Sequence, residues 1–383
     1  MTPQARAQAA IDILDEVIAA ARDAGAAADV IIQRYFRARR YAGSKDRRAV
    51  RELVYAAIRR SGERPETGRA ALVGLAEGDP ALAALFDGSV HGPPPIAANE
   101  PSAEAAEVPM WLREKLGGLG LLDRAPLDLR INRLKDGPIA IEGATPTPHA
   151  PDGLRLPEGT LVDTLPEYEA GLVEVQDEGS QLVTLACAAE PGMKVVDLCA
   201  GAGGKTLGLA AAMGDRGVIF ACDADRNRLS RLAPRAERAG VTIAETRLLD
   251  GGREIMALGD LMGAADLVVV DAPCSGTGTW RRNPEARWRL TPERLARVVA
   301  LQSRLLDVAA RLVRPGGTLV HIVCSLLDEE GAGQAEAFLA RHPGWAAEPV
   351  TLTTGIPRGP GLRLTPATDG TDGFFVARLK APC

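Results

Sequence analysis

The second half of this chain repeats one pattern, in which short apolar runs end at glycine or an acid and helical stretches follow. Strands that alternate with helices indicate a parallel sheet, so the fold class expected is α/β. The apolar runs lie at 194–198, 217–223, 266–271 and 317–323, with a shorter one before Asp250. A last apolar segment, at 373–379, is expected to form part of an antiparallel pair.

Composition is ordinary for a globular chain: 383 residues, of which 46% are apolar and 25% charged. Two or three domains are expected at this length. No uncharged apolar run reaches the roughly 18 residues of a membrane helix, so a cytoplasmic protein without membrane contact is expected. The six cysteines form no CxxC pair and the four histidines do not cluster near them. Neither a metal site nor a disulfide is therefore expected.

Changes in composition predict four segments. Residues 1–87 show helical spacing of apolar positions, and Ser44 is a candidate N-cap for an amphipathic helix that includes Asp46 to Arg60. Residues 88–101 are rich in proline and indicate a stiff linker. A small α+β module is expected at 102–173, and the α/β domain at 174–383.

The formal net charge of −5 argues against a nucleic-acid partner, but the charge is uneven. From Arg34 to Arg64 there are eleven basic residues and three acids, a local excess of +8. Such a patch can neutralise phosphates, and it can equally be the solvated face of a helical domain.

The motif VVDLCAGAGGKT places Gly201, Gly203 and Gly204 in a tight turn after a strand, where the backbone can approach a ligand closely. A Walker A loop needs another glycine at the position of Cys199, and a dinucleotide fingerprint needs a third glycine that this motif lacks. A loop for S-adenosylmethionine fits better, because that cofactor carries no pyrophosphate. Asp223 and Asp250 follow the next two strands, where carboxylates can accept from ribose hydroxyls and from the adenine amino group.

Two further strand-end motifs, DAPCSGTG and VHIVCS, carry Cys274 and Cys324. A thiolate that adds to carbon 6 of cytosine makes carbon 5 nucleophilic, and cysteine is also a good leaving group. Asp271 can act as the acid near ring atom N3. The usual fate of a strand-end cysteine is a small buried hydrophobe, which we expect for Cys187, Cys222 and Cys383. Cys199 is expected to be buried too, with its backbone near the cofactor.

These motifs resemble the RNA (cytosine-5) methyltransferases of the Sun/Nop type over about residues 174–383. The resemblance implies a class I S-adenosylmethionine-dependent methyltransferase with a Rossmann-like, mostly parallel, seven-stranded sheet. It implies methylation of carbon 5 of a cytosine in RNA, with small-subunit ribosomal RNA as expected substrate, transfer RNA as alternative, and a monomer as default state. The resemblance rests on VQDEGSQLV, DLCAGAGGKT, DAPCSGTGTWRRNPEARW, the pair Leu301 and Gln302, RPGGTLVHIVCS and DGFFVARL.

The resemblance also implies residue roles. Cys324 is expected to attack carbon 6 and Cys274 to assist release of the methylated base; the choice of nucleophile comes from the resemblance alone. Asp271 is expected to contact the cytosine, with Lys205 near the same pocket. The residues expected to hold the cofactor are Cys199, Ala200, Gly201, Ala202, Gly203, Gly204, Lys205, Asp223, Arg228, Asp250 and Asp271.

The N-terminal part is similar to the NusB-like RNA-binding domain of the bacterial ribosomal members, best over RAVRELVYAAIRR. The family's turn reads CAAPGGKT, whereas Gly201 and Ala202 stand here in place of Ala-Pro; because the glycines remain, cofactor binding is expected to persist. Four arginines beside Trp280 and Trp288 could bind RNA by charge and stacking, or Trp288 could belong to the core.

Two other functions stay open. An amino-methyltransferase would use the DAPC position without needing a thiol. A ribosome-assembly factor with a degenerate core would bind RNA but no cofactor; the intact Cys274, Cys324, Asp271 and Lys205 argue against it.

Overall fold

The structure, a computed structural model, describes residues 1–23 and 25–383, which form two compact units. Unit 1 consists of 1–124 and 279–291, and unit 2 of 125–278 and 292–383. The sequence suggested boundaries at 87, 101 and 173 and gave no sign that 279–291, here called the return segment, belongs with the N-terminal residues. Over 1–23 and 25–383, no helix combines the length and the apolar character that crossing a bilayer requires.

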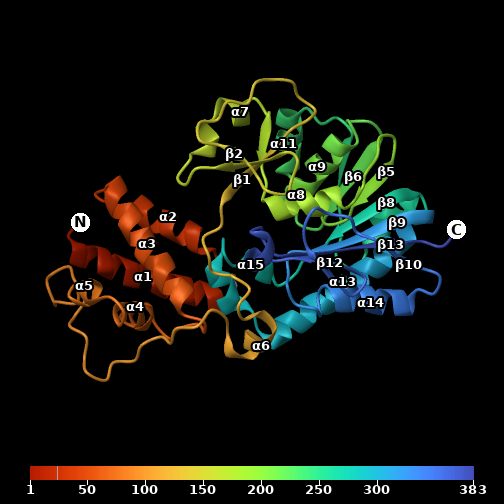
Figure 1. The fold of residues 1–383 in the computed structure, drawn as a ribbon. Helices are drawn as coiled ribbons and strands as arrows, with labels where there is room; N and C mark the ends of the chain where they lie inside the picture. Colours follow the sequence, from red (N-terminus) through yellow and green to blue (C-terminus); the bar gives the residue numbers. More distant parts are fainter. Residues whose placement is uncertain (24) are drawn as a thin grey trace. The chain divides into compact units, whose positions relative to one another are not determined.

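Unit 1 is helical (Figure 1). Its α3 begins at Ser44, one residue after the position that caps it: the Gly43 N–H donates to the Asp46 carboxylate over 3.1 Å. The expected N-cap at Ser44 is therefore wrong by one residue. The helices are α1 (Pro3–Arg22), α2 (Ala28–Ala38), α3 (Ser44–Arg60), α4 (Gly68–Ala76), α5 (Pro80–Ala83), α6 (Arg113–Leu116), and the 3-10 turns η1 (Met110–Leu112) and η5 (Pro284–Arg289).

The return segment packs into unit 1. Arg287 is fully buried and its Nη2 donates to the carbonyl oxygens of Ile58, Arg59 and Ser61, at 2.5, 2.9 and 2.7 Å. These carbonyls lie at the C-terminal end of α3, where a helix leaves its last carbonyl oxygens without i+4 partners, so the guanidinium caps it. The Ile58 oxygen also accepts from the Ser61 N–H, at 3.2 Å. The indole of Trp288 donates to Ser61 O as well, at 2.9 Å.

The structure decides between the two interpretations of this segment. Trp280 and Trp288 are 0% and 4% exposed, and Arg281 and Arg287 are buried too. Rings buried in this way cannot stack on bases. The suggested RNA-stacking role is wrong, and Trp288 is a core residue.

Unit 2 is built on a nine-stranded sheet within the described residues. Seven strands, in the order β12-β13-β9-β8-β5-β6-β7, make the sheet expected from the sequence, and the short β10 and β11 extend it. The five strands from β9 to β7 are parallel, whereas β13 runs antiparallel to β9. The strands are β5 (Lys194–Asp197), β6 (Val218–Asp223), β7 (Ala244–Leu248), β8 (Ala265–Asp271), β9 (Val313–Val323), β10 (Ala346–Glu348), β11 (Ile356–Arg358), β12 (Gly361–Leu364) and β13 (Phe374–Lys380).

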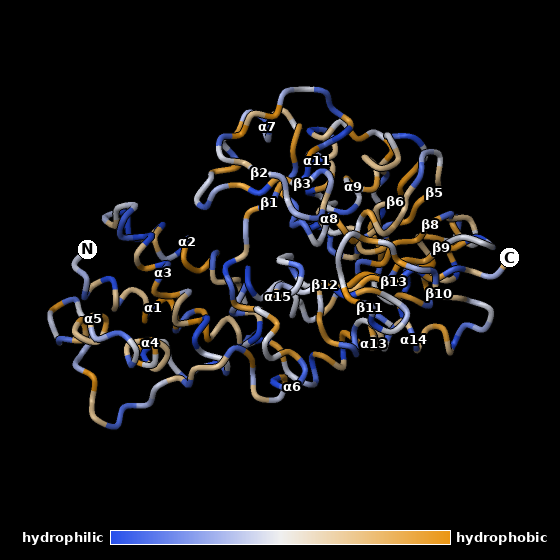
Figure 2. Tube along the Cα trace, viewed as in Figure 1, coloured by the Kyte–Doolittle hydropathy of each residue, from blue (hydrophilic) through white to orange (hydrophobic). Residues whose placement is uncertain are grey.

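Helices cover both faces of this sheet (Figure 1). Because side chains alternate along a strand, Val268 and Val270 pack on one face with α13 and α14, while Leu267 and Val269 pack on the other with α8, α9 and α11. Figure 2 shows the hydrophobic residues concentrated along these central strands. The helices are α8 (Glu178–Leu185), α9 (Gly204–Ala212), α10 (Arg226–Leu229), α11 (Leu232–Ala239), α12 (Glu254–Leu258), α13 (Pro292–Leu312), α14 (Ala332–Arg341) and α15 (Pro366–Asp369), with η3 (Gly259–Leu261) and η4 (Thr277–Thr279).

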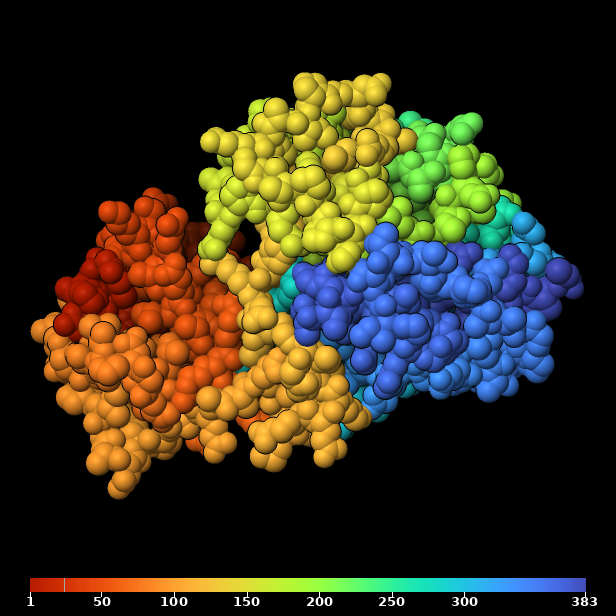
Figure 3. All heavy atoms as spheres, in the orientation of Figure 1, coloured from red at the N-terminus to blue at the C-terminus, as the bar shows by residue number. Residues whose placement is uncertain are grey.

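A small antiparallel sheet, in the order β2-β3-β1-β4, precedes the large one, and Figure 3 shows its residues in yellow beside the green part of unit 2. Its elements are β1 (Leu127–Ile131), β2 (Thr145–Pro146), β3 (Gly153–Leu156), η2 (Val162–Thr164), α7 (Pro166–Glu169) and β4 (Val173–Val175).

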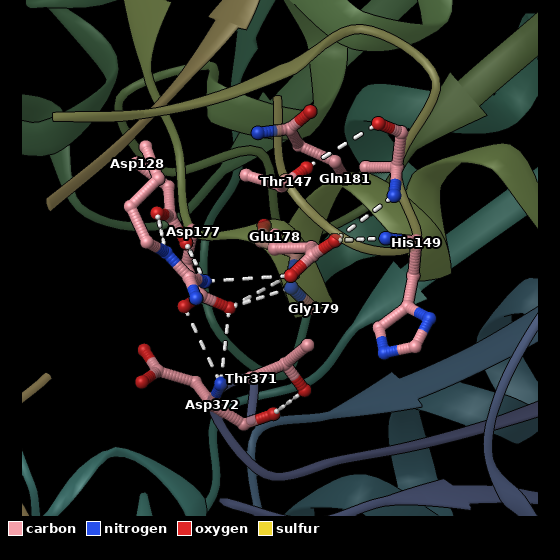
Figure 4. Close-up of polar contacts among 12 residues, drawn as sticks. Asp128, Thr147, His149, Asp177, Glu178, Gly179, Gln181, Thr371 and Asp372 are labelled. Atoms are coloured by element: carbon pink, nitrogen blue, oxygen red, sulfur yellow. Dashed lines mark hydrogen bonds and ion pairs between the residues drawn. The ribbon is translucent and has the colours of Figure 1, made fainter. Parts of the chain in front are cut away.

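The start of α8 joins the small sheet to the large one (Figure 4). Glu178 is fully buried and accepts from the N–H groups of His149 and Ala150, at 2.5 and 3.0 Å. The neighbouring Asp177 caps α8 and also accepts from the Asp372 N–H, at 3.3 Å. Two carboxylates of the VQDEGSQLV motif thus fix both the small sheet and the loop before β13.

Candidate active site

The predicted site residues lie at one edge of the large sheet, where its parallel strands end. Neighbouring strands β9, β8, β5, β6 and β7 lead to Cys324, Asp271, the glycine turn, Asp223 and Asp250, in that order. Ligands of open α/β sheets bind at this edge, beyond the carboxyl ends of the strands. The order places the thiols near β8 and β9, and the predicted cofactor residues along β5, β6 and β7.

The glycine turn between β5 and α9 depends on backbone conformations that favour glycine. Gly201 and Gly203 have φ values of +55° and +85°. A Cβ added at Gly201 would lie 2.5 Å from the guanidinium of Arg228, so a side chain there would strain the positive φ and displace Arg228. Asp223 closes the turn from β6, because its carboxylate accepts from the Gly201 N–H over 2.7 Å.

Asp197 is a buried carboxyl group that the sequence analysis missed. It ends β5, is fully buried, and accepts from the Thr206 hydroxyl at 2.7 Å through Oδ2. Among the described residues its Oδ1 has no hydrogen-bond partner. Burial raises the pKa of Asp197 to about 7. Its position at a strand end, like those of Asp223 and Asp271, was the available signal.

The remaining cofactor candidates differ in their surroundings. Cys199 is partly buried, and burial raises the pKa of its thiol well above the usual range. Ala202 contributes a carbonyl oxygen that accepts from Arg235 at 2.6 Å. Asp250 lies two residues beyond β7 and is exposed to solvent.

The thiol groups of Cys274 and Cys324 lie in contact. Their Sγ atoms are 3.3 Å apart, and both side chains are partly buried. The hydrogen bond with Cys324, burial, and the nearby negative charge of Glu330 raise the pKa of the Cys274 thiol well above its usual range. Two residues separated by fifty positions therefore form one thiol pair at the ends of adjacent parallel strands.

Beside the sheet edge, Lys205 and Asp271 form an ion pair with Nζ and Oδ2 2.7 Å apart. Lys205 is 8% exposed and its ammonium lies 5.3 Å from the centre of the Phe374 ring. Burial alone would lower the Lys205 pKa, but the Asp271 carboxylate outweighs burial and raises it. Asp271 keeps 29% of its side chain exposed and can therefore meet a ligand.

Backbone hydrogen bonds of Gly278 connect the segments that carry the two thiols to the DGFFVARL segment. The Gly278 N–H donates to the carbonyl oxygen of Cys324 at 3.1 Å, and the Gly278 oxygen accepts from the Gly373 N–H at 2.8 Å. The backbones approach so closely that a Cβ on Gly278 would lie 2.0 Å from the Gly373 oxygen. The DAPCSGTG, VHIVCS and DGFFVARL segments thus form one packed unit.

Of the three other cysteines expected to be buried, two are buried and one is exposed. Cys187 and Cys222 are 1% and 0% exposed, and burial raises the pKa of each to about 12. Cys383 is exposed, so its predicted burial is wrong.

The strand order, the antiparallel β13 and the glycine turn after β5 define a class I S-adenosylmethionine-dependent methyltransferase. Comparison with known proteins then identifies the family. The family model for "16S rRNA methyltransferase RsmB/F" matches residues 184–380, about half of the chain. The chain belongs to this family, which confirms the relationship inferred from its motifs.

Individual relatives agree with this assignment. The chain is 37% identical over 270 residues to the probable ribosomal RNA small subunit methyltransferase B of Synechocystis, covering 66% of this chain and 60% of that protein. The chain spans about 60% of the length of the curated relatives it matches.

Solved structures are similar as well. A methyltransferase homolog from Pyrococcus horikoshii is 28% identical with a TM-score of 0.58, over 68% of this chain and 87% of that one. NSun6 from the same organism, solved with SFG, is 20% identical with a TM-score of 0.62, over 71% and 98% of the two chains; this likeness concerns the fold.

The residues present fit S-adenosylmethionine, the family's cofactor. At Gly204 no atom lies within 4 Å of the position that a Cβ would take, which leaves the backbone of the turn open to close approach. The carboxylate of Asp223 has acceptor positions beyond its two backbone bonds, to Gly201 and Asp225, that ribose hydroxyls can use. The unpartnered Oδ1 of Asp197 lies at the strand end that leads into the same turn.

Proposed function

We propose that this protein methylates carbon 5 of a cytosine in small-subunit ribosomal RNA, through a covalent bond between Cys324 and carbon 6 of the base. The observation that carries the proposal is the 3.3 Å separation of the Cys274 and Cys324 sulfurs at the sheet edge. An amino-methyltransferase has no use for such a pair. The family relationship supports ribosomal RNA as the substrate.

In the proposed reaction the Cys324 thiolate forms a bond to carbon 6, and the electron pair of the C5–C6 double bond becomes available at carbon 5. S-adenosylmethionine, when bound, supplies an electrophilic methyl group. Asp271 contacts the base near N3, and the Lys205 ammonium paired with it supplies the positive charge that stabilises the negative charge developing on the ring. Once carbon 5 carries the methyl group, its proton is lost to water and the C6–S bond breaks, with the bonding pair returning to the Cys324 sulfur. The Cys274 thiol assists by donating a hydrogen bond to that sulfur, and the C5–C6 double bond returns.

The remaining roles follow from position. We propose that the glycine turn from Cys199 to Lys205, together with Asp223, Arg228 and Asp250, holds the cofactor. Every proposed site residue belongs to unit 2 of one chain, which supports action as a monomer. A ring inside a duplex is out of reach for a thiol, so the target cytosine must be unpaired or flipped out.

Unit 1 offers a surface for RNA. Eight of the basic residues between Arg34 and Arg64 are exposed, and some of them pair with acids, as Arg34 does with Glu16 and Arg51 with Asp29. We propose that this face binds RNA phosphates, with an affinity that falls as salt rises. The exposed residues are Arg34, Arg37, Arg40, Lys45, Arg47, Arg48, Arg51 and Arg64.

The test measures transfer of tritium from labelled S-adenosylmethionine to unmodified small-subunit ribosomal RNA and, separately, to transfer RNA. Wild type is compared with Cys324→Ala, Cys274→Ala and the exposed control Cys383→Ala. We expect Cys324→Ala to abolish transfer, Cys274→Ala to accumulate a protein–RNA complex that survives denaturing gels, and the control to match wild type. Full transfer by Cys324→Ala would refute the covalent mechanism, and labelling of transfer RNA alone would refute the substrate.

A further inference from the structure

Glu330 is a fully buried carboxylate that neither the motifs nor the proposed reaction uses. It lies in the turn between β9 and α14, six residues beyond Cys324. The four hydrogen bonds described for it come from neutral groups on three segments of the chain. Burying a charge costs free energy unless hydrogen bonds compensate for the lost hydration. We therefore asked what the hydrogen bonds of Glu330 hold in place.

The four bonds tie together the two loops that carry the thiols. Oε1 accepts from the Ser275 N–H at 2.7 Å, and Oε2 accepts from the Ser275 hydroxyl and from the Ser325 hydroxyl, the latter at 2.5 Å. Ser275 directly follows Cys274, and Ser325 directly follows Cys324. One carboxylate therefore holds the residue next to each thiol.

The third segment is α13. Its fully buried Gln302 donates from Nε2 to Glu330 Oε1 at 3.1 Å and to the Pro273 oxygen at 2.9 Å. Pro273 precedes Cys274, so the Cys274 loop is held on both sides of its thiol. Thr277 completes the cluster, since its hydroxyl lies 3.1 Å from the Ser325 hydroxyl and accepts from the Leu326 N–H at 2.8 Å.

We propose that Glu330 is a positioning residue for the proposed reaction, which sets the spacing of Cys274 and Cys324 and holds Cys274 in its neutral form by its negative charge. A neutral Cys274 thiol can donate a hydrogen bond to the Cys324 sulfur and so stabilise the attacking form of that residue. The inference rests on the proposed function only for the spacing role, because the charge effect exists in the protein alone.

The charge effect has a definite direction. The titratable groups that act on Cys274 are Cys324, from the end of β9, and Glu330, from the turn before α14; α13 contributes the neutral amide of Gln302. The hydrogen bond with Cys324, burial and Glu330 all raise the Cys274 pKa. Removing the charge at residue 330 must therefore make Cys274 easier to ionise.

Glu330→Gln and Glu330→Asp separate the two roles. Glu330→Gln keeps the shape and loses the charge, whereas Glu330→Asp keeps the charge and shortens the side chain. Glu336→Gln, at an exposed position on α14, is the matched control. The first measurement is the rate of iodoacetamide alkylation of each cysteine without RNA or cofactor, followed by peptide mass spectrometry, over a pH range that extends from neutral to above the usual pKa range of a thiol. Exposed Cys383 is the internal reference.

For Glu330→Gln we expect the alkylation midpoint of Cys274 to fall by about one pH unit, which makes alkylation about tenfold faster at neutral pH. Cys383 and the Glu336→Gln protein should be unchanged. A merely structural role would not move this midpoint, and an unchanged midpoint in a folded Glu330→Gln protein overturns the charge role.

For Glu330→Asp we expect the midpoint to stay near wild type while kcat for methyl transfer falls about 10- to 100-fold and KM for RNA stays within twofold. If Glu330→Asp has the kcat of wild type, the spacing role is overturned. If its Cys274 alkylation midpoint shifts although the charge is kept, the charge role is overturned, and this test stands even where Glu330→Gln does not fold. If wild type transfers no methyl group to any RNA, the proposed function fails, while the alkylation profiles still decide the charge role.

Discussion

Replacing Gly278 by alanine should damage both the stability of unit 2 and the thiol pair. The added Cβ would lie 2.0 Å from the Gly373 oxygen and 2.6 Å from its carbonyl carbon. Both atoms are backbone, so the loops themselves must separate by roughly 1 Å or more. Overpacking of this kind costs about 1–3 kcal/mol, and loss of the Gly278–Gly373 hydrogen bond adds about 1 kcal/mol.

A total of about 2–4 kcal/mol corresponds to a drop in Tm of roughly 4–16 °C for a unit of this size. Because Gly278 also donates to the Cys324 oxygen, the same shift displaces the proposed nucleophile, and kcat should fall by about 100-fold. Scanning calorimetry and the tritium assay measure the two effects. Gly259→Ala is the control, since its Cβ meets no atom within 4 Å. A Gly278→Ala protein with wild-type Tm would refute the reasoning.

Three further predictions concern other buried groups. Burial lowers the pKa of His321 to about 4, below the 6.5 of the unfolded chain, so this residue should remove about 2 kcal/mol of unfolding free energy between pH 7 and 5. Asp197, with its raised pKa, adds stability over the same range, so the His321 effect is measured as the difference in pH dependence between wild type and His321→Gln in urea titrations. Glu178→Ala leaves the N–H groups of His149 and Ala150 without their acceptor, while Arg155 keeps Asp128, and should cost about 2–4 kcal/mol by the same titration at pH 7; a loss below 1 kcal/mol would contradict this. Asp223→Ala should weaken binding of S-adenosylmethionine about 10- to 100-fold by calorimetry, with exposed Glu237→Ala unchanged.

The large sheet could be predicted from the sequence because its strands are short apolar runs with clear ends. The expected strand at 266–271 is β8 at Ala265–Asp271, and the expected strand at 217–223 is β6 at Val218–Asp223. Strand ends of a parallel sheet meet at one edge, so the grouping of the site residues there followed from the pattern.

Side-chain partners could not be predicted in the same way. Nothing local to Glu330 indicates that its carboxylate meets Ser275, which lies 55 positions earlier. The Cys-Ser pair that recurs at 274–275 and 324–325 was a usable signal, but a serine beside a cysteine has no fixed meaning without the fold.

The two interpretations of the return segment could not be distinguished from the sequence for a related reason. Arginines beside tryptophans suit both RNA binding and a buried cap, and composition does not distinguish them. The deciding fact is that three carbonyl oxygens at the end of α3 lie where Arg287 can reach them, more than 220 positions away in the sequence.

Because 279–291 belongs to unit 1, the polypeptide passes between the units at three places: after Arg124, after Gly278 and after Thr291. A single protease cut after Arg124 would therefore leave both pieces associated, since the C-terminal fragment still contributes Trp288 and Arg287 to the core of the other. A gene fragment that begins at Ala125 would instead carry a tryptophan-rich stretch without its packing partners, and such a stretch favours aggregation. Unit 2 is therefore not expected to remain soluble when residues 125–383 are expressed alone.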